Sequence, residues 1–264
     1  MRLSSLQNSR IKEIRALSQR RTRYETGLFF VEGIRLVGEA LQTRAEIKYI
    51  VVAPELLRSE FGKQLISRAG DDGVECLTVS PAIFQNLSSK DGPQGIGAVV
   101  RQKWTALGEV KPDEKLGWIV LEEVADPGNL GTILRTGDAV GASGVILLGN
   151  TVDPYDPASV RGSMGSIFSQ HLIRTSLEDL IQWKHESNVP MVGTSDAASI
   201  DYREADYTPP LLLCLGGERH GLSETHIKAC EMVVRIPMVG RADSLNLAIA
   251  AGVMLYDAYS RTQV

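Results

Sequence analysis

The stretch Leu211-Leu212-Leu213-Cys214-Leu215-Gly216-Gly217-Glu218-Arg219-His220-Gly221-Leu222 joins an uninterrupted apolar run to a glycine-rich polar turn. Its apolar half predicts a strand that is buried on both faces, as in a parallel sheet. The glycines that follow let the backbone approach a ligand closely. Read alone, the stretch predicts a tight strand-to-helix turn, because its spacing matches neither G-x-G-x-x-G nor the Walker A loop.

Other apolar runs extend this pattern along the C-terminal part of the chain. Four more strands are predicted, with helical patterns between most of them, at Trp118–Leu121, Gly144–Leu148, Val189–Thr194 and Val233–Ile236. Near-continuous apolar strands separated by helices indicate a buried parallel sheet. We therefore predict an α/β fold with a parallel-sheet domain over residues 117–264.

The first hundred residues predict a separate and smaller α/β unit. Its strands are expected at Leu28–Val31, Ile47–Val52, Val74–Val79 and Ile96–Val100, and its helices at Ile34–Leu41, Pro54–Ala69 and Pro81–Leu87. A polar stretch containing Gly108 and Pro112 follows, and such a composition is typical of a linker. The expected domains are residues 1–104 and 117–264, joined by residues 105–116.

Charge is distributed unevenly along the 264 residues, whose net charge is −4. Residues 1–44 contain nine Lys or Arg and four Glu, a net charge of +5, so the remainder carries −9. This basic segment suits a polyanion, but a solvated basic helix explains the charge equally well. It also has the composition of a mitochondrial transit peptide, although the apolar stripe of Leu6, Ile11, Ile14 and Leu17 favours a structural helix and a cytoplasmic protein.

Composition and motifs exclude several classes of protein. The hydrophobic share of 43% is ordinary for a packed globular protein, and no run approaches the roughly 18 apolar residues of a membrane span. The chain has three cysteines and no CxxC pair, with Cys76, Cys214 and Cys230 far apart in sequence. Neither a disulfide framework nor a zinc ribbon is therefore expected. The histidines lack metal-ligand spacing and G-x-S-x-G is absent, so neither a metal site nor the common hydrolase elbow is expected.

Two further polar segments follow predicted strands, where open α/β sheets place their ligand sites. In residues 126–137, DPGNLGTILRTG, Asn129 is suited to capping a helix that carries Arg135 among apolar or small residues. Such an arginine needs an anionic partner, and a structural salt bridge would supply one. In residues 236–248, IPMVGRADSLNLA, Ser244 and Asn246 stand at the start of the last helix, where capping alone would explain the serine.

The last predicted helix, residues 246–259, is apolar nearly all the way round. A helix of this kind is buried on every side. Burial by a second subunit and burial within the same chain both account for the pattern.

In their order and spacing, these segments together resemble the SpoU/TrmH family of the SPOUT superfamily, the RNA ribose 2′-O-methyltransferases that use S-adenosylmethionine. Residues 126–136, 216–222 and 236–248 are similar to the family's three motifs, and the likeness extends from Trp118 to the end of the chain. In the N-terminal part, residues 8–12, 30–33 and 94–97 resemble the substrate-binding domain of ribosomal RNA members.

The resemblance implies a C-terminal trefoil knot, a homodimer, and S-adenosyl-L-methionine as the cofactor, with no metal. Positions that match the family's cofactor contacts are Thr194, Leu215, Gly216, Gly217, Ile236, Met238 and Leu245. The family's polar catalytic positions fall on Asn129, Arg135, Glu218, Ser244 and Asn246. Arg219 and Gly137 depart from the pattern, because glycine and alanine are usual there.

The implied reaction is the attack of a ribose 2′-oxygen on the sulfonium methyl group, for which the protein aligns the atoms, excludes water and handles one proton. An arginine, with a pKa above about 12, is a poor base. We therefore expect Arg135 to pair with the target phosphate and stabilise the nascent alkoxide, with Glu218 orienting it. Glu218 as the base stays open.

The extra N-terminal domain favours ribosomal RNA over transfer RNA as the substrate, without indicating the nucleotide or whether the role is housekeeping or antibiotic resistance. Two alternatives belong to other classes: a non-catalytic RNA-binding or ribosome assembly factor with the same fold, and a nucleotide-dependent metabolic enzyme.

Overall fold

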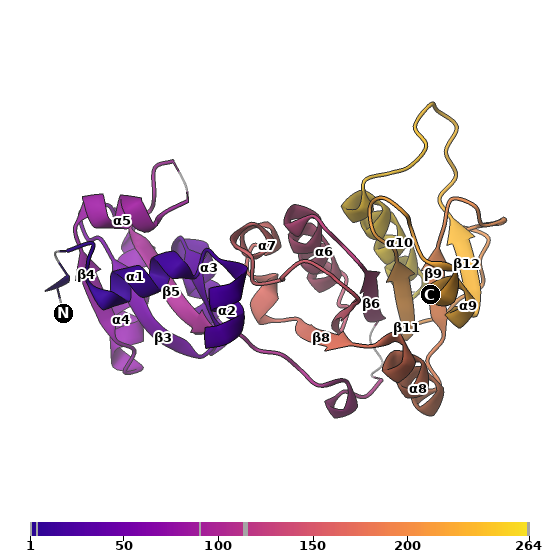
Figure 1. Cartoon of the computed structure of the whole chain (residues 1–264), viewed down its shortest axis with the longest axis horizontal. Helices are drawn as coiled ribbons and strands as arrows, with labels where there is room; N and C mark the ends of the chain where they lie inside the picture. The colour runs from indigo at the N-terminus through magenta and orange to yellow at the C-terminus, as the bar shows by residue number, and fades with distance from the viewer. Residues whose placement is uncertain (1, 4, 90, 113–115, 263–264) are drawn as a thin grey trace. The chain divides into compact units, whose positions relative to one another are not determined.

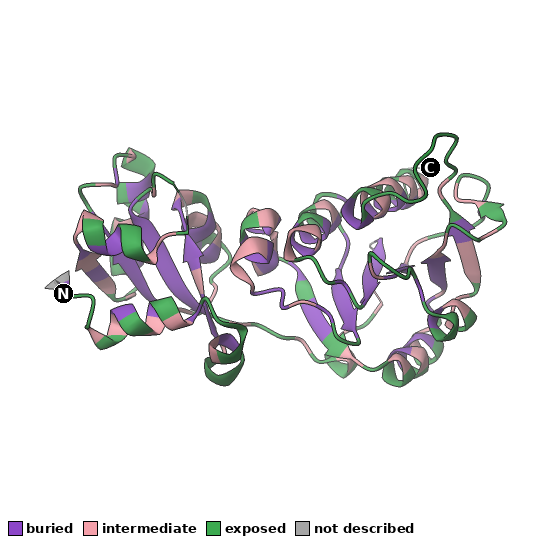
Figure 2. Cartoon of the chain, turned by 45° about the horizontal axis from the view of Figure 1, so that its top comes forward, coloured by how far each residue is buried: buried purple, intermediate pink, exposed green. Residues whose placement is uncertain are grey.

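The computed structural model describes residues 2–3, 5–89, 91–112 and 116–262. The chain forms two compact units, of which the first comprises Met1–Gln102 and Tyr155–Phe168 and the second Lys103–Pro154 and Ser169–Val264. The chain therefore leaves the second unit after Pro154 and returns to it at Ser169. In each unit the strands are the buried part, and the helices expose one face (Figure 2).

The first unit is built on a five-stranded mixed sheet in the order β1-β4-β3-β5-β2. Strand β5 is antiparallel to both β2 and β3, whereas β1, β4 and β3 are mutually parallel. The strands are β1 (Arg2–Leu3), β2 (Leu28–Glu32), β3 (Ile47–Val52), β4 (Cys76–Val79) and β5 (Ile96–Arg101). The helices are α1 (Ser9–Ala16), α2 (Arg20–Thr26), α3 (Ile34–Gln42), α4 (Glu60–Asp71), α5 (Pro81–Leu87) and α7 (Pro157–Ser163), with a 3-10 turn at Ser166–Phe168 (Figure 1).

The basic N-terminal segment forms two short helices rather than one. The Asn8 side chain accepts a hydrogen bond from the Arg10 N–H and caps α1, whereas α2 ends at Gly27, whose φ of 64° favours glycine. Ile11, Ile14 and Leu17 are buried in the core of the unit, and Leu6 is exposed. The apolar stripe therefore belongs to a structural helix.

The segment Tyr155–Phe168 packs within the first unit although it lies far along the chain. The Tyr155 and Phe29 rings lie 4.7 Å apart between centroids. The Arg23 guanidinium, 1% exposed, donates to Asp156 Oδ2 at 3.2 Å and to the carbonyls of Leu17 and Ser18. A buried arginine needs such partners, so Asp156 is part of the core structure of this unit.

The second unit contains a seven-stranded sheet in the order β10-β12-β9-β11-β6-β7-β8, in which every pair is parallel. The strands are β6 (Gly117–Glu122), β7 (Gly144–Leu148), β8 (His171–Thr175), β9 (Met191–Thr194), β10 (Ile200–Asp201), β11 (Leu211–Leu215) and β12 (Met232–Arg235). The helices are α6 (Pro127–Ala139), α8 (Leu177–Ser187), α9 (Glu224–Ala229) and α10 (Leu247–Arg261), with a 3-10 turn at Leu107–Glu109. The predicted parallel sheet and the smaller α/β unit before it are confirmed.

Several details differ from the expectations, among them one helix start, one strand and the burial of the last helix. Helix α4 begins at Glu60 rather than at Pro54, because Ser59 caps it by accepting from the Gly62 N–H. Strand β8 was not predicted, since only Leu172 and Ile173 of its five residues are buried. Helix α10 is not buried on every side within the chain, because Ile249 and Tyr256 are 56% and 55% exposed.

The expected boundaries at residues 1–104, 105–116 and 117–264, and the trefoil knot, stay predictions. Residues 113–115 of the expected linker lie outside the described part of the chain. Among the described residues, no helix is both long enough and apolar enough to cross a bilayer.

Candidate functional site

A cavity of about 570 Å³ lies in the second unit beyond the carboxyl ends of β9, β11 and β12. Open parallel sheets place their ligands at this edge. All seven residues expected to contact the cofactor line it: Thr194, Leu215, Gly216, Gly217, Ile236, Met238 and Leu245. Glu218, Ser244 and Asn246 from the expected catalytic set line it as well. The sequence did not single out two other lining residues that follow β9, Ser195 and Asp196.

The two glycines after β11 allow the chain to turn back on itself beside the cavity. A Cβ on Gly216 would lie 1.9 Å from the carbonyl carbon of Gly221 and 2.0 Å from its oxygen. A Cβ on Gly217 would lie 2.9 Å from the Glu123 carbonyl oxygen, just after β6. Backbone atoms form both contacts, so no side-chain rotation could relieve them, and glycine is required on packing grounds.

The carboxylate of Glu218 ties this turn to the start of α6. It accepts hydrogen bonds from the backbone N–H groups of Ala125 and Asp126, at 3.0 and 3.1 Å, and from Asn129 Nδ2 at 3.0 Å. Burial alone would raise the pKa of Glu218, but these hydrogen bonds outweigh it and hold the pKa below its ordinary value of 4.5. Glu218 is therefore an ionised anchor near neutral pH, and a weak base.

The side-chain amide of Asn129, in segment 126–137, makes hydrogen bonds to both of the other polar segments. Its Nδ2 donates to Glu218, while its Oδ1 accepts from Asn246 Nδ2 at 2.9 Å. Asn246 caps α10, since its Oδ1 accepts from the N–H groups of Ala248 and Ile249. Segments 126–137, 216–222 and 236–248 thus meet in one continuous chain of hydrogen bonds.

Asn129 is free for this role because a different residue caps α6. The Asp126 carboxylate accepts from the Asn129 N–H at 2.8 Å, and Pro127 occupies the first helical position. The expectation that Asn129 caps the helix was wrong. The Asp-Pro pair was the available signal, because proline is favoured directly after a capping aspartate.

Behind the loop, a buried pair that the sequence did not single out connects β6 to α9. Glu122 lies 2.8 Å from His226 Nδ1 and accepts from the Ser223 N–H at 2.9 Å. The Ser223 hydroxyl also lies 2.7 Å from His226 Nδ1. This contact fixes the far end of the 216–222 loop. No cluster of His, Cys, Asp or Glu among the described residues has the arrangement of a metal site.

Arg135 does not line the cavity of its own chain. Its side chain is exposed on α6 and makes no hydrogen bond or ion pair with any residue that the structure describes. Arg135 does not contact Glu218 of the same chain, whose carboxylate accepts from Asn129 and from two backbone N–H groups. The Arg135 side chain forms no structural salt bridge with the described residues, and its guanidinium is exposed to solvent.

The two departures from the motif pattern are accommodated. Arg219 does not have a positive φ, so its backbone does not need glycine. A Cβ on Gly137 would lie 2.6 Å from Ile119 Cδ1, so glycine lets α6 pack closely on β6.

The loop that joins β12 to α10 projects from its neighbours and is exposed from Pro237 to Asn246, including Ser244 (Figure 1).

Comparison with known proteins agrees with this geometry. The SpoU rRNA Methylase family matches residues 118–256, and the MRM3-like substrate binding domain matches residues 8–98. A 23S rRNA (uridine(2479)-2′-O)-methyltransferase of Streptomyces viridochromogenes is 32% identical, over 95% of this chain and 89% of its own. The 23S rRNA (guanosine(2553)-2′-O)-methyltransferase RlmP of Bacillus subtilis is 29% identical, over 96% and 97%.

A solved structure gives the same result. The AdoMet-bound rRNA methyltransferase from Sinorhizobium meliloti superposes with a TM-score of 0.90 at 39% identity, covering 98% of this chain and 97% of its own. The likeness includes both units, and the cavity lies within the residues that the first family matches. The chain therefore belongs to the SpoU rRNA methylase family.

Proposed function

We propose that this protein transfers a methyl group from S-adenosylmethionine to a ribose 2′-hydroxyl of ribosomal RNA. The observation that carries the proposal is the cavity at the carboxyl edge of the parallel sheet, where Asn129, Glu218 and Asn246 join three separate segments. The relatives named above act on ribosomal RNA, which supports this RNA over transfer RNA. Such a substrate corresponds to a cytoplasmic protein, with residues 1–104 as the RNA-binding domain.

The cavity fits the cofactor in size and in chemistry. Its volume of about 570 Å³ lies within the range typical of small-ligand pockets, about 300–1,000 Å³. Leu215, Ile236 and Leu245 offer apolar walls, while Asp196 and Asp243 at the rim suit a positively charged ligand. These residues and Gly216 would hold S-adenosylmethionine, which supplies the electrophilic methyl group when bound.

The protein's own residues position the reactants. Glu218, Asn129 and Asn246 hold the cavity wall in shape, and the low pKa of Glu218 makes it an anchor rather than a proton acceptor. Arg135 supplies an unpaired guanidinium that suits a phosphate, and its charge stabilises the developing alkoxide. The proposed catalytic role of Arg135 is therefore electrostatic.

Mapping ribose methylation across total RNA tests this function. RNA from cells with the gene should carry one ribosomal 2′-O-methyl group that is absent from cells without it, and purified enzyme with labelled S-adenosylmethionine should restore the group. Methylation of transfer RNA instead would show that the substrate is transfer RNA and not ribosomal RNA. Cofactor binding without transfer to any RNA would favour the non-catalytic assembly factor.

We also propose a homodimer that contacts through α10. One face of this helix is apolar and exposed, with Ile249, Tyr256 and Tyr259 at 56%, 55% and 38% exposure, although α10 packs against α6 with its other face. Residues at this spacing form a single stripe along a helix. A second copy that covers the stripe would complete the burial that the all-round apolar sequence predicts.

Ile249→Lys is expected to dissociate the dimer. A lysine at the centre of an apolar contact should weaken association by at least about 30-fold, the effect of losing one strong interface residue. Sedimentation at micromolar protein should give twice the chain mass of 28.8 kDa for the wild type and one chain mass for the variant. Phe61→Lys, at an exposed position on α4, is the matched control and should stay dimeric. A monomeric wild type would overturn the dimer.

Asn129→Asp is expected to open the chain of hydrogen bonds at neutral pH. The introduced carboxylate would face Glu218, and two like charges cannot both ionise there without raising one pKa. Methyl transfer should fall about 10-fold or more, the usual worth of a hydrogen bond to a charged group. Lowering the pH protonates one carboxylate and restores a donor, so the ratio to wild type should rise toward pH 5.

Two control variants accompany this pH experiment. Asn129→Ala should lose activity equally at every pH, because it has nothing to protonate. Gln182→Glu turns an exposed amide into a carboxylate on α8, outside the cavity lining, and should behave as wild type. An Asn129→Asp enzyme with wild-type turnover at pH 7.5 would remove the hydrogen-bond chain from the mechanism.

A further inference from the structure

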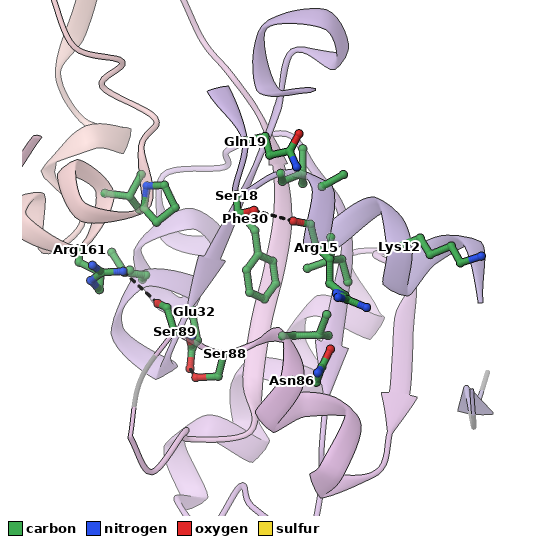
Figure 3. A pocket seen from close by; sticks show the side chains of 17 residues that line it. Lys12, Arg15, Ser18, Gln19, Phe30, Glu32, Asn86, Ser88, Ser89 and Arg161 are labelled. Carbon is green, nitrogen blue, oxygen red and sulfur yellow. Dashed lines mark hydrogen bonds between the residues drawn. The ribbon is translucent and has the colours of Figure 1, made fainter. Parts of the chain in front are cut away.

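A second cavity, of about 530 Å³, lies in the first unit, away from the methyl-transfer motifs. Residues of α1, β2, α5 and α7 line it, among them Arg15, Phe30, Asn86 and Arg161 (Figure 3). The cavity lies within one compact unit, and its volume is in the small-ligand range. Its one aromatic residue among the described lining, Phe30, lies outside the three methyl-transfer motifs and belongs to residues 30–33, which resemble the substrate-binding domain.

Phe30 gives the cavity a flat apolar surface. It lies on β2 opposite Val99 of β5, and its ring is half-buried. A Cβ on Gly97 would lie 2.5 Å from a ring carbon of Phe30, so the missing side chain at Gly97 provides the space in which the ring lies. The ring extends into the cavity (Figure 3), and a partly accessible aromatic face is what an unstacked base requires.

Cations without partners lie at this cavity. Lys12 and Arg15 are exposed on α1 and make no hydrogen bond or ion pair with side chains in the described part of the chain. Other arginines of α1 and α2 are paired: Arg10 with Glu13 and Glu75, and Arg21 with Glu25. In Figure 3 Lys12 extends away from the other labelled side chains, whereas Arg15 stays on the side of α1 where they lie. Arg15 is therefore a cation at the cavity with which no described side chain pairs.

Polar groups complete the wall opposite α1. Glu32, 7% exposed, accepts from the Ser88 hydroxyl at 2.5 Å and from the Ser89 N–H at 3.2 Å, and Arg161 donates to the Ser89 hydroxyl at 3.0 Å. These contacts hold the end of α5 in place. The amides of Gln19 and Asn86 also line the cavity, without hydrogen-bond partners among the described residues. Amides of this kind can pair with the edge of a base.

We propose that this cavity binds one unpaired nucleotide of the substrate RNA, with its base stacked on Phe30 and an adjoining phosphate on Arg15. The inference rests on the proposed function for its RNA. An aromatic face, a free guanidinium and unpaired amides within one cavity correspond to the stacking, phosphate and base-edge contacts by which proteins bind single-stranded RNA. The nucleotide bound here is separate from the one that is methylated, and it selects the RNA.

Filter binding of the full-length protein to an unmodified 23S rRNA transcript tests the cavity. Phe30→Leu keeps the apolar volume but loses the stacking face, so affinity should fall about 10-fold with an unchanged salt dependence. Arg15→Ala should weaken binding and reduce the slope of log K against log salt by about 1. The matched controls on α4, Phe61→Leu and Arg68→Ala, replace exposed residues outside the cavity and should bind as wild type.

Three further measurements separate the possible outcomes. Thermal melts and S-adenosylmethionine affinity, which depends on the second unit, should match wild type in all four variants. Ultraviolet cross-linking should join an RNA nucleotide to the peptide that contains Phe30. If Phe30→Leu and Arg15→Ala bind as wild type while the wild type methylates the transcript, the cavity proposal fails and the proposed function stands. A wild type that binds the transcript through this cavity but methylates no RNA would refute the function alone.

Discussion

Gly216→Ala is expected to abolish S-adenosylmethionine binding. The added methyl carbon would lie 1.9 Å from the carbonyl carbon of Gly221 and 2.1 Å from the Leu222 nitrogen, far inside van der Waals contact. Because both are backbone atoms, the 216–222 loop would have to open, and it forms one wall of the cofactor cavity. Calorimetric titration should show affinity reduced by at least about 100-fold, since forced backbone shifts in packed regions cost several kcal/mol.

The control for this loss is Gly108→Ala. Nothing lies within 4 Å of a Cβ at Gly108, so this variant of the same unit should bind the cofactor normally. Circular dichroism should show that Gly216→Ala stays folded, because the clashing atoms of Gly221 and Leu222 belong to the 216–222 loop and not to a strand. Wild-type affinity in folded Gly216→Ala protein would show that the loop adapts freely, and the cavity would then not depend on its tight turn.

Arg135→Ala is expected to reduce methyl transfer by about 100- to 1000-fold, the usual effect of removing a positioned electrostatic group. Cofactor affinity should barely change, because Arg135 lies outside the cavity lining. Stability should also be unaffected, since Arg135 makes no ion pair with the described residues. Single-turnover methylation on saturating RNA, beside thermal melts, measures these quantities separately.

Two comparisons complete the test of Arg135. Arg135→Lys keeps the charge but loses the planar fork of donors, so it should recover only part of the rate. Lys228→Ala removes an exposed cation of α9 whose one ion pair among the described residues is with Glu224 at 3.6 Å, and it should turn over as wild type. Near-normal turnover by folded Arg135→Ala would eliminate the proposed electrostatic role.

Because Arg135 lies outside its own cavity, the proposed dimer allows it to act on the cavity of the partner. Mixing Gly216→Ala chains with Arg135→Ala chains then places an intact cavity and an intact arginine together in one site of each mixed dimer. We expect recovery of about a quarter of wild-type activity from random exchange between two inactive proteins, as two-fold symmetry dictates. No recovery, with exchange of subunits verified, would show that Arg135 acts within its own chain.

The buried strands were predictable because short, continuous apolar runs bounded by glycine or polar residues indicate them. Residues 211–215 and 144–148 read as uninterrupted apolar runs, and both are central strands buried on both faces. Strand β8 lies at the edge of the sheet beside β7 only, and its mixed sequence HLIRT therefore gives no strong signal. The start of α4 depended on a single capping hydroxyl, Ser59, which competes with Pro54 as a start signal.

Only the residues of the candidate site that the family resemblance matched were predictable from the sequence. Ten of the twelve residues that the resemblance selected line one cavity, and Asn129 and Arg135 do not. The cofactor contacts stay a prediction. The resemblance could not supply the pairing within the site: Glu218 was expected to orient Arg135, but its oxygens accept from Asn129 and two backbone N–H groups. Hydrogen-bond partners depend on loop geometry to within an ångström, which residue spacing does not encode. The cavity around Phe30 likewise depends on Gly97, because a side chain there would clash with the Phe30 ring. A glycine in a sequence does not indicate which neighbour occupies the space beside it.

The return of Tyr155–Phe168 to the first unit has a consequence during synthesis. The first unit cannot complete its core until residue 168 has left the ribosome, because Phe29 lacks its Tyr155 contact and Arg23 lacks the Asp156 carboxylate before then. By that point β6, α6 and β7 of the second unit have also been made. Domains usually fold in order as they emerge, but here the nascent chain holds two unfinished cores at once. Newly made chains should therefore stay sensitive to protease until well past the midpoint of translation.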